Sequence, residues 1–103
     1  MGQKVSFDDI KKIISVDAIN TFATNLYLYI VGAVWGHVNV HYNPITDCME
    51  IMIKNRAFNM EPFRMTYPEF SKEMRFGTSA GLIGHHVIQE YESYIDQYIF
   101  KRG

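Results

Sequence analysis

Residues 37–53 read HVNVHYNPITDCMEIMI, and this stretch predicts a β-hairpin. In its first part polar and apolar residues alternate, which puts the two histidines and the asparagine between them on one face of a strand. Residues 43–47 supply turn chemistry, because Asn and Asp bond locally to the backbone and Pro fixes its φ angle. Residues 48–53 form a second β-prone run. Two antiparallel strands are therefore expected at the centre of the chain.

Helical spacing precedes the hairpin. Apolar residues recur three and four apart between residues 18 and 30, and Asp17 is positioned to cap the start of that helix. From residue 27 to residue 34 the run is apolar on every side, so a buried strand would also fit its later part. We expect a helix there, ended by Gly32 and Gly36.

The region after the hairpin lacks a sustained period. Residues 54–77 hold prolines, asparagines and scattered aromatics, so we predict a long loop with one helical turn near residues 68–72. Helical spacing returns at Ser79, whose hydroxyl is expected to cap a helix that continues to the basic C-terminus. The predicted fold class is α+β, with N-terminal helices, a central β-hairpin, a long loop and a C-terminal helix.

Composition limits the chain to one small domain or partial domain, residues 1–103. Apolar residues make up 48% and aromatics 15%, which is too much for a disordered tail. This surplus of large apolar side chains is also what a piece of a larger domain would show. The net charge of −1 and the lack of a basic run exclude the electrostatic footprint of a nucleic-acid binder.

The N-terminal part carries two short signals. Gly2 and Ser6 match the outline of an N-myristoylation motif, and residues 7–15 have the spacing of a short amphipathic helix. No secretory signal is recognised, and the apolar run 26–35 is well short of the roughly twenty residues that cross a bilayer. We expect no membrane-spanning segment. The single cysteine, Cys48, is interpreted as a small packing residue of the hairpin.

The C-terminal helix contains the sequence Gly84-His85-His86. His86 and Glu90 are four apart on one helical face, which predicts a solvated surface pair. A metal site of these two residues and one strand histidine is the alternative interpretation. His37 and His41 cannot both bind that metal, because four residues of strand separate them by about 13 Å.

Three segments occur in an order that is typical of a known family. Residues 38–44 read VNVHYNP, residues 50–53 read EIMI, and residues 75–85 read RFGTSAGLIGH. From residue 35 to residue 92 the chain thereby resembles the neprilysin-like (M13) zinc metallopeptidases. The first segment is similar to their substrate-binding strand, the second to the strand that returns from it, and the third to the approach to their zinc-binding helix.

The resemblance assigns roles to individual positions. Asn39 and Val40 occupy the substrate-binding positions, and His85 stands at the first zinc histidine. His86 stands at the catalytic glutamate and Gln89 at the second zinc histidine, and neither side chain suits that role. The family's third zinc ligand would lie beyond Gly103. The resemblance therefore implies zinc for the family, and we expect this chain to bind none.

Two functions follow from these residues. The leading hypothesis is a fragment of a neprilysin-like metalloendopeptidase catalytic domain whose zinc motif is degenerate and which is catalytically inactive. The alternative is a non-catalytic pseudopeptidase that binds extended peptides through the edge strand that holds Asn39. A peptide or protein is the expected partner in both. Family members are extracellular or bound to the plasma membrane, and this chain shows neither signal nor anchor, so no compartment is predicted.

Overall fold

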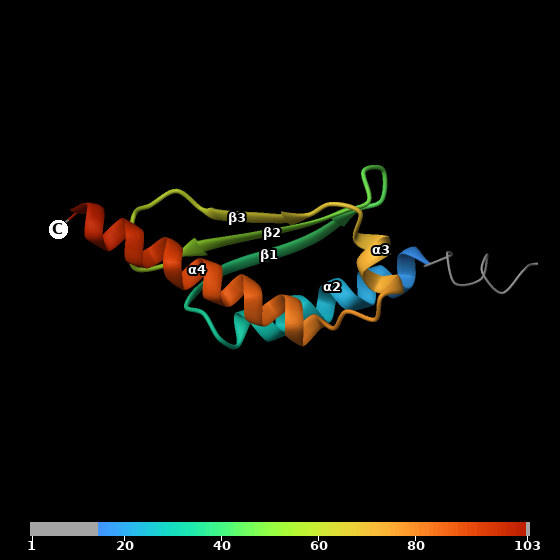
Figure 1. Ribbon diagram of the computed structural model, residues 1–103. Coiled ribbons are helices and arrows are strands. Elements are labelled where there is room, and N and C mark those ends of the chain that lie inside the picture. Colours follow the sequence, from blue (N-terminus) through green and yellow to red (C-terminus); the bar gives the residue numbers. More distant parts are fainter. Residues whose placement is uncertain (1–14, 103) are drawn as a thin grey trace, which may run out of the picture.

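The computed structural model describes residues 15–102 and consists of two layers. Three strands form an antiparallel sheet in the order β1-β2-β3, and two long helices lie against one face of it (Figure 1). The predicted α+β class is confirmed, whereas the Gly2 motif and all but the last residue of the helix predicted over residues 7–15 lie outside the described residues. The elements are α2 (Val16–Val31), β1 (Gly36–Asn43), β2 (Cys48–Asn55), β3 (Phe63–Tyr67), α3 (Phe70–Arg75) and α4 (Ala80–Arg102).

The N-cap of helix α2 lies two residues before the predicted one. The hydroxyl of Ser15 accepts a hydrogen bond of 3.1 Å from the amide of Ala18, so Ser15 is the N-cap and the prediction of Asp17 was wrong. Asp17 lies in the first turn, where a negative charge favours the helix dipole. The helix continues to Val31 and ends at Gly32, which confirms helix over strand for this apolar run.

The predicted hairpin is formed by β1 and β2. Its register pairs Val38 with Ile53, Val40 with Ile51 and Tyr42 with Met49, and all of these side chains face the helices. The residues between them face the opposite side of the sheet, which the helices leave open (Figure 1). The sheet thus has one apolar face and one polar face, as expected where only one face packs on a core.

The prediction of a long loop over residues 54–77 was wrong in one respect, because this segment contains a third strand. β3 pairs with β2 in antiparallel fashion, with Met65 opposite Ile51. The strand holds only five residues and has a proline immediately before and after it. The expected helical turn is present as α3. The amide of Phe70 in α3 donates to the carbonyl of Asp47 at 2.9 Å, which ties this helix to the hairpin turn.

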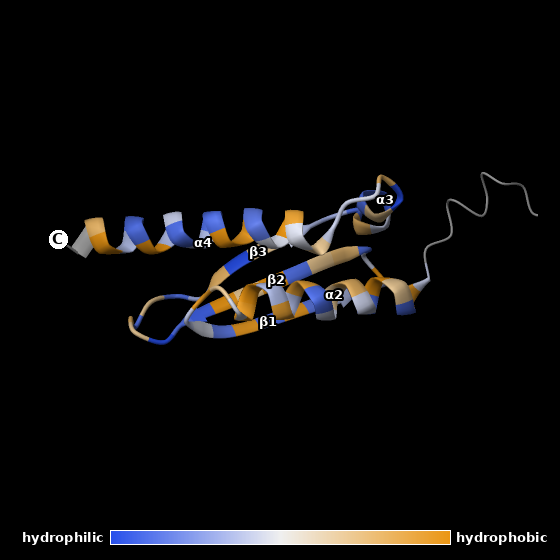
Figure 2. Ribbon diagram, turned by 90° about the horizontal axis from the view of Figure 1, so that it is seen from below, coloured by the Kyte–Doolittle hydropathy of each residue, from blue (hydrophilic) through white to orange (hydrophobic). Residues whose placement is uncertain are grey.

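Helix α4 begins where the sequence indicated. The hydroxyl of Ser79 accepts a hydrogen bond of 3.1 Å from the amide of Leu82, so the predicted cap is confirmed. Polar and apolar residues alternate along α4 (Figure 2), and its apolar side closes the core together with α2 and the inner face of the sheet. The most deeply buried side chains are Ile19, Leu26 and Ile30 of α2, Met49 and Ile53 of β2, Phe70 of α3, and Val87 of α4.

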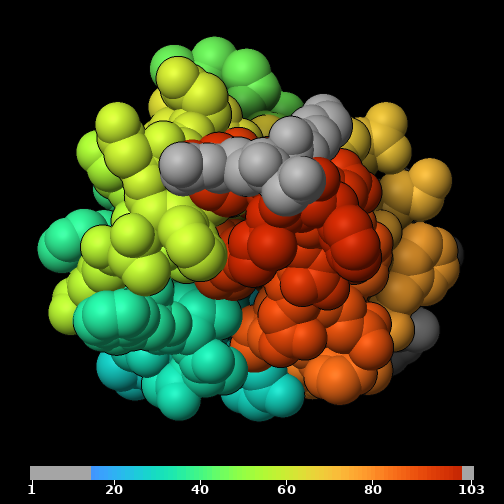
Figure 3. All heavy atoms as spheres, turned by 90° about the vertical axis from the view of Figure 1, so that its left-hand side faces the viewer, coloured from blue at the N-terminus to red at the C-terminus, as the bar shows by residue number. Residues whose placement is uncertain are grey.

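The loop between β2 and β3 lies beside the C-terminal half of α4 (Figure 3). The hydroxyl of Tyr94 donates to the carbonyl of Glu61 at 2.6 Å, and the hydroxyl of Tyr98 donates to that of Asn59 at 3.3 Å. These bonds fix the loop to the helix and so to the sheet. None of the helices in the described part of the chain has both the length and the apolar character needed to cross a bilayer.

Candidate functional site

Strand β1 is an edge of the sheet. Its eight residues pair with β2 on one side, and no hydrogen bond within residues 15–102 joins its other side to any segment. Alternate residues of an edge strand point their N–H and C=O groups away from the sheet, where another extended chain can pair with them. β1 also lacks proline and lysine, which proteins often place on edge strands to prevent such pairing.

The other edge is less suited to adding a strand. β3 is shorter, its flanking Pro62 and Pro68 cannot donate backbone hydrogen bonds, and α4 lies against it. Because β1 is longer and its backbone donors are not interrupted by proline, β1 is the edge that would accept an added strand.

A groove runs beside the free edge of β1. It has a volume of about 350 Å³ and lies between this strand and one flank of α2. The opposite flank of α2 carries Tyr29, which packs against α4, so the groove opens away from α4 and along the edge. Its lining residues are Asn20, Ala23, Thr24 and Tyr27 of α2, and Val40, His41 and Tyr42 of β1.

The two predicted substrate-binding residues both lie in the middle of β1. Asn39 is exposed on the open face of the sheet, opposite Met52 of β2. Val40 is half-buried, faces the helix side and lines the groove. They are adjacent in the chain but point to opposite faces of the sheet. An extended peptide paired with β1 would pass both of them.

A second hollow, of about 640 Å³, lies over the open face of the sheet. Cross-strand pairing puts His41 next to Glu50 and Glu50 next to Thr66 across its three strands. His37, the other strand histidine, pairs with Lys54 near the far end of β1. This face is polar and carries charge of both signs.

The helical positions assigned to zinc point away from the protein. Ile83, Val87 and Tyr91 define the side of α4 that faces the core. His85 and Gln89 are exposed and fall on the outer side of the same helix. Asn39 lies on the far face of the sheet, so the structure does not bring it together with His85. One peptide could not contact both residues within this chain.

His86 bridges α4 and β3. The hydroxyl of Tyr67 lies 2.7 Å from Nδ1 of His86, and Nε2 of His86 lies 3.5 Å from the carboxylate of Glu90. The predicted surface pair of His86 and Glu90 is therefore present. Burial raises the pKa of Tyr67 to about 12, with further contributions from the charges of Glu73 and Glu90. Tyr67 is thus a neutral hydrogen-bonding group that holds the imidazole against β3.

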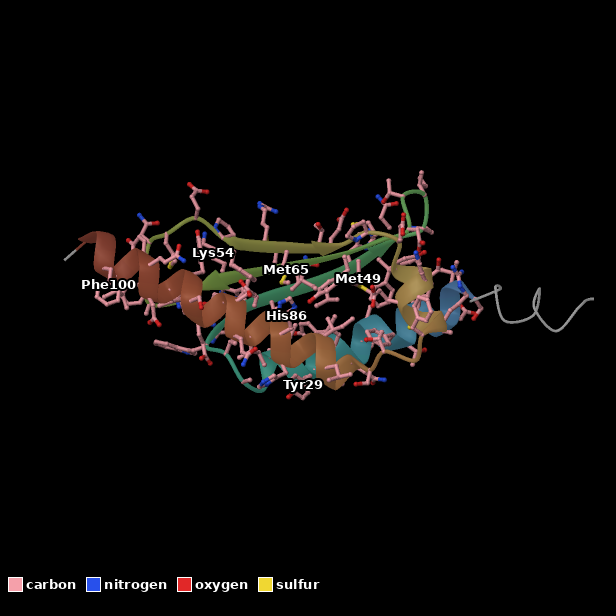
Figure 4. The ribbon with its side chains drawn as sticks, in the orientation of Figure 1. Tyr29, Met49, Lys54, Met65, His86 and Phe100 are labelled. Atoms are coloured by element: carbon pink, nitrogen blue, oxygen red, sulfur yellow. The ribbon has the colours of Figure 1, made fainter. Side chains whose placement is uncertain are left out.

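The glycine of the Gly-His-His sequence has a packing role. The aromatic ring of Tyr29 lies directly on Gly84, and a Cβ atom at that position would overlap the ring. Figure 4 shows Tyr29 beside the first turns of α4. This close approach of α2 and α4 requires glycine irrespective of any metal. Gly84 is therefore explained by helix packing.

The histidine, cysteine and carboxylate side chains of the described residues are poorly arranged to bind a metal ion. Within residues 15–102, no group of three or more His, Cys, Asp and Glu side chains could hold a metal ion. His85 has only the carboxamide of Gln89 on its own face one turn away, and a carboxamide is a weak zinc ligand. Cys48 is half-buried at the start of β2, and its thiol lies near the carbonyl of Met49.

Asp47, which the sequence indicates only as part of a turn, connects several elements of the structure. Its carboxylate accepts hydrogen bonds from the hydroxyl of Tyr42 at 2.6 Å, and from the hydroxyl and amide of Ser71 at 2.6 and 3.0 Å. Partial burial favours a higher pKa, but the hydrogen bonds from Ser71 and Tyr42 and the charge of Arg75 outweigh it and lower the pKa of Asp47. The carboxylate thus joins β1, the hairpin turn and α3.

The groove residues on α2 carried no signal in the sequence. Ala23 and Tyr27 fit an ordinary apolar helix, and only the position of α2 beside β1 shows that they line a groove.

Comparison of the chain with models of protein families, with curated proteins and with solved structures found no match in any of the three.

Proposed function

We propose that this protein is a non-catalytic peptide-binding domain that pairs an extended segment with β1. The free edge of β1 beside the α2 groove carries this proposal. Backbone hydrogen bonds along an edge supply affinity in such complexes, and pockets for alternate side chains supply specificity. β1 offers both features side by side, since its edge is unpaired among the described residues and the groove adjoins it.

Trp35 provides a direct way to measure binding. It is the one tryptophan of the sequence, it is 67% exposed, and it lies immediately before β1. A strand added to β1 would change its surroundings. We expect saturable changes in its fluorescence when extended peptides with aliphatic residues at alternate positions are titrated. Peptides with a proline at the centre of the same sequence should bind much more weakly, because proline prevents regular strand pairing.

N-methylated peptides test the mode of binding. In a paired strand only alternate backbone N–H groups point to the partner. Methylation of one alternate set should therefore abolish binding, whereas methylation of the other set should leave the affinity nearly unchanged. Equal effects of the two sets would contradict strand addition. The absence of saturable binding by any extended peptide would contradict the function itself.

Asn39→Ala tests the position of the site. Loss of a hydrogen bond of about 1 kcal/mol corresponds to a roughly fivefold weaker affinity. Thr66→Ala is the matched control, because Thr66 is exposed on the same face of the sheet but lies on β3. A larger effect of Thr66→Ala would move the site from the edge of β1 to the hollow on the open face.

As a second proposal, based on the resemblance, the chain is a catalytically inactive relative of the neprilysin-like metallopeptidases. The position of Asn39 in an edge strand and of His85 on the long C-terminal helix supports it. The separation of these two residues argues that the chain does not cleave peptides alone. Peptidase activity of the purified chain that a chelator removes would contradict this proposal.

A further inference from the structure

The charged residues on the open face of the sheet make the two ends of the β1 edge opposite in charge. Cross-strand pairing puts Lys54 beside His37 near the start of β1 and Glu50 beside His41 near its end. Lys54 and Glu50 are both exposed, and neither takes part in the ion pairs found between residues 15 and 102. A chain lying along β1 therefore meets positive charge at one end and negative charge at the other.

These charges are close enough to act on an added strand. Neighbouring strands lie about 4.8 Å apart, so a strand paired with β1 would lie about 10 Å from β2. Charges at this separation still interact at ionic strengths up to about 0.1 M, where the screening length is about 10 Å. An acidic residue opposite His37 would approach Lys54, and a basic residue opposite His41 would approach Glu50.

The groove selects the side chains of the added strand that lie between the residues opposite His37 and His41. An added side chain opposite Val40 points to the helix side, as Val40 does, and enters the groove. The lining of the groove includes the apolar side chains of Ala23 and Val40 and the ring of Tyr27. Its volume of about 350 Å³ accommodates an aliphatic side chain, and β-branched residues also suit the strand conformation.

The direction of the added strand follows from pairing stability. Both strand pairs of this sheet are antiparallel, and antiparallel pairs are slightly more stable per residue than parallel ones. We infer that the partner of β1 is an extended segment that runs antiparallel to it, with a basic residue opposite His41, an acidic residue opposite His37 and aliphatic residues on the helix side between them. This inference rests on the proposed peptide-binding function and adds the chemistry and direction of the peptide.

Two peptides of identical composition test the inference. One has the core Lys-Val-Thr-Val-Glu and the other the core Glu-Val-Thr-Val-Lys, both with acetylated and amidated ends. In an antiparallel complex the first places its lysine near Glu50 and its glutamate near Lys54, and the second reverses both. We expect the first to bind about fivefold more tightly at low salt, and the difference to shrink at high salt.

A charge-swapped protein provides the matched control. Both altered residues of the variant Lys54→Glu/Glu50→Lys are exposed, so the variant should fold, which far-ultraviolet circular dichroism checks. It should prefer the second peptide, with the preference reversed by about the same factor. Replacing the first valine of the favoured peptide by aspartate should weaken binding to both proteins, because that side chain enters the groove.

The outcomes of the peptide comparison distinguish the charge inference and the strand direction from the proposed function itself. If both peptides bind equally well at low salt, strand addition stands and the charge inference is wrong. If wild-type protein prefers the second peptide, the added strand does not run antiparallel in this register and the inference is overturned. If neither peptide binds and no other extended peptide does, the proposed function fails together with the inference.

Discussion

At the scale of single residues, Asp47 links more elements than any predicted site residue. It has a positive φ angle of 53°, and its side chain holds Tyr42 at the end of β1 and Ser71 at the start of α3. Aspartate tolerates this backbone conformation better than most residues, and its carboxylate can accept several hydrogen bonds at once. The residue therefore fixes both the turn of the hairpin and the helix that follows β3.

Asp47→Ala should lower the free energy of unfolding by about 2–4 kcal/mol, because it removes three hydrogen bonds to a charged acceptor. Asp47→Asn should lose roughly half as much, since asparagine keeps an acceptor oxygen and also tolerates a positive φ angle. Urea denaturation measures both. Equal stabilities of wild type and Asp47→Ala would show that these contacts do not hold the turn.

The lowered pKa of Asp47 also predicts a pH dependence. A carboxylate whose pKa is lower in the folded than in the unfolded state adds stability that is fully present above the unfolded value of about 4. That contribution is lost as the pH falls through the lower pKa of the folded state. We expect wild-type stability to decrease more steeply below about pH 4 than that of Asp47→Asn. Parallel acid-denaturation curves would contradict this.

At the scale of elements, the close contact between α2 and α4 depends on one of two glycines in the first turns of α4. A Cβ atom at Gly84 would overlap the ring of Tyr29, whereas a Cβ at Gly81 would be 3.9 Å from the same ring. The two positions lie in the same helix and differ mainly in this distance. They form a matched pair for testing the packing.

Gly84→Ala should destabilise the protein by about 1–3 kcal/mol, because the ring of Tyr29 must move to make room. Gly81→Ala should be neutral or stabilise it by up to about 1 kcal/mol, since alanine favours a helix and has space there. Thermal and urea unfolding compare the two. In the Tyr29→Ala background the cost of Gly84→Ala should largely disappear, and its persistence would rule out the ring as the cause.

Most elements were predictable from the sequence, and β3 shows why one was not. The hairpin, α2 and α4 have clear local signals in alternation, helical spacing and capping residues, whereas α3 was expected only as one helical turn. β3 also alternates, but its five residues lie between two prolines in a segment rich in turn-forming residues. Its strand conformation depends on pairing with β2, which is a long-range interaction. The cap of α2 was missed because Ser15 and Asp17 are both good N-caps and only geometry distinguishes them.

At the scale of the whole molecule, the two-layer arrangement decides which residues can form a site. The helices cover one face of the sheet, and the order β1-β2-β3 leaves β1 at an edge (Figure 1). Because β3 was not predicted, the sequence did not indicate which strand of the hairpin would lie at an edge of the sheet. Likewise, only the packed structure shows that Asn39 and His85, which were both predicted as site residues, lie in different layers.

The outward direction of His85 and Gln89 predicts how the protein responds to metal. A zinc site with a Kd of about 1 μM would stabilise the folded state by about 2.7 kcal/mol at 100 μM zinc. We expect no such change, and no effect of a chelator, in thermal unfolding of wild type or His85→Ala. A zinc-dependent increase that His85→Ala abolishes would restore the metallopeptidase interpretation of this helix.

The proposed function depends on the binding of an extended peptide to the free edge of β1. The most direct test is amide hydrogen exchange, followed residue by residue by NMR with and without the Lys-Val-Thr-Val-Glu peptide. We predict that alternate residues of β1, whose N–H groups point away from β2, gain protection, while the amides of β3 do not change. Protection confined to β3, to α4 or to the open face, or no protection under saturating peptide, would contradict the claim.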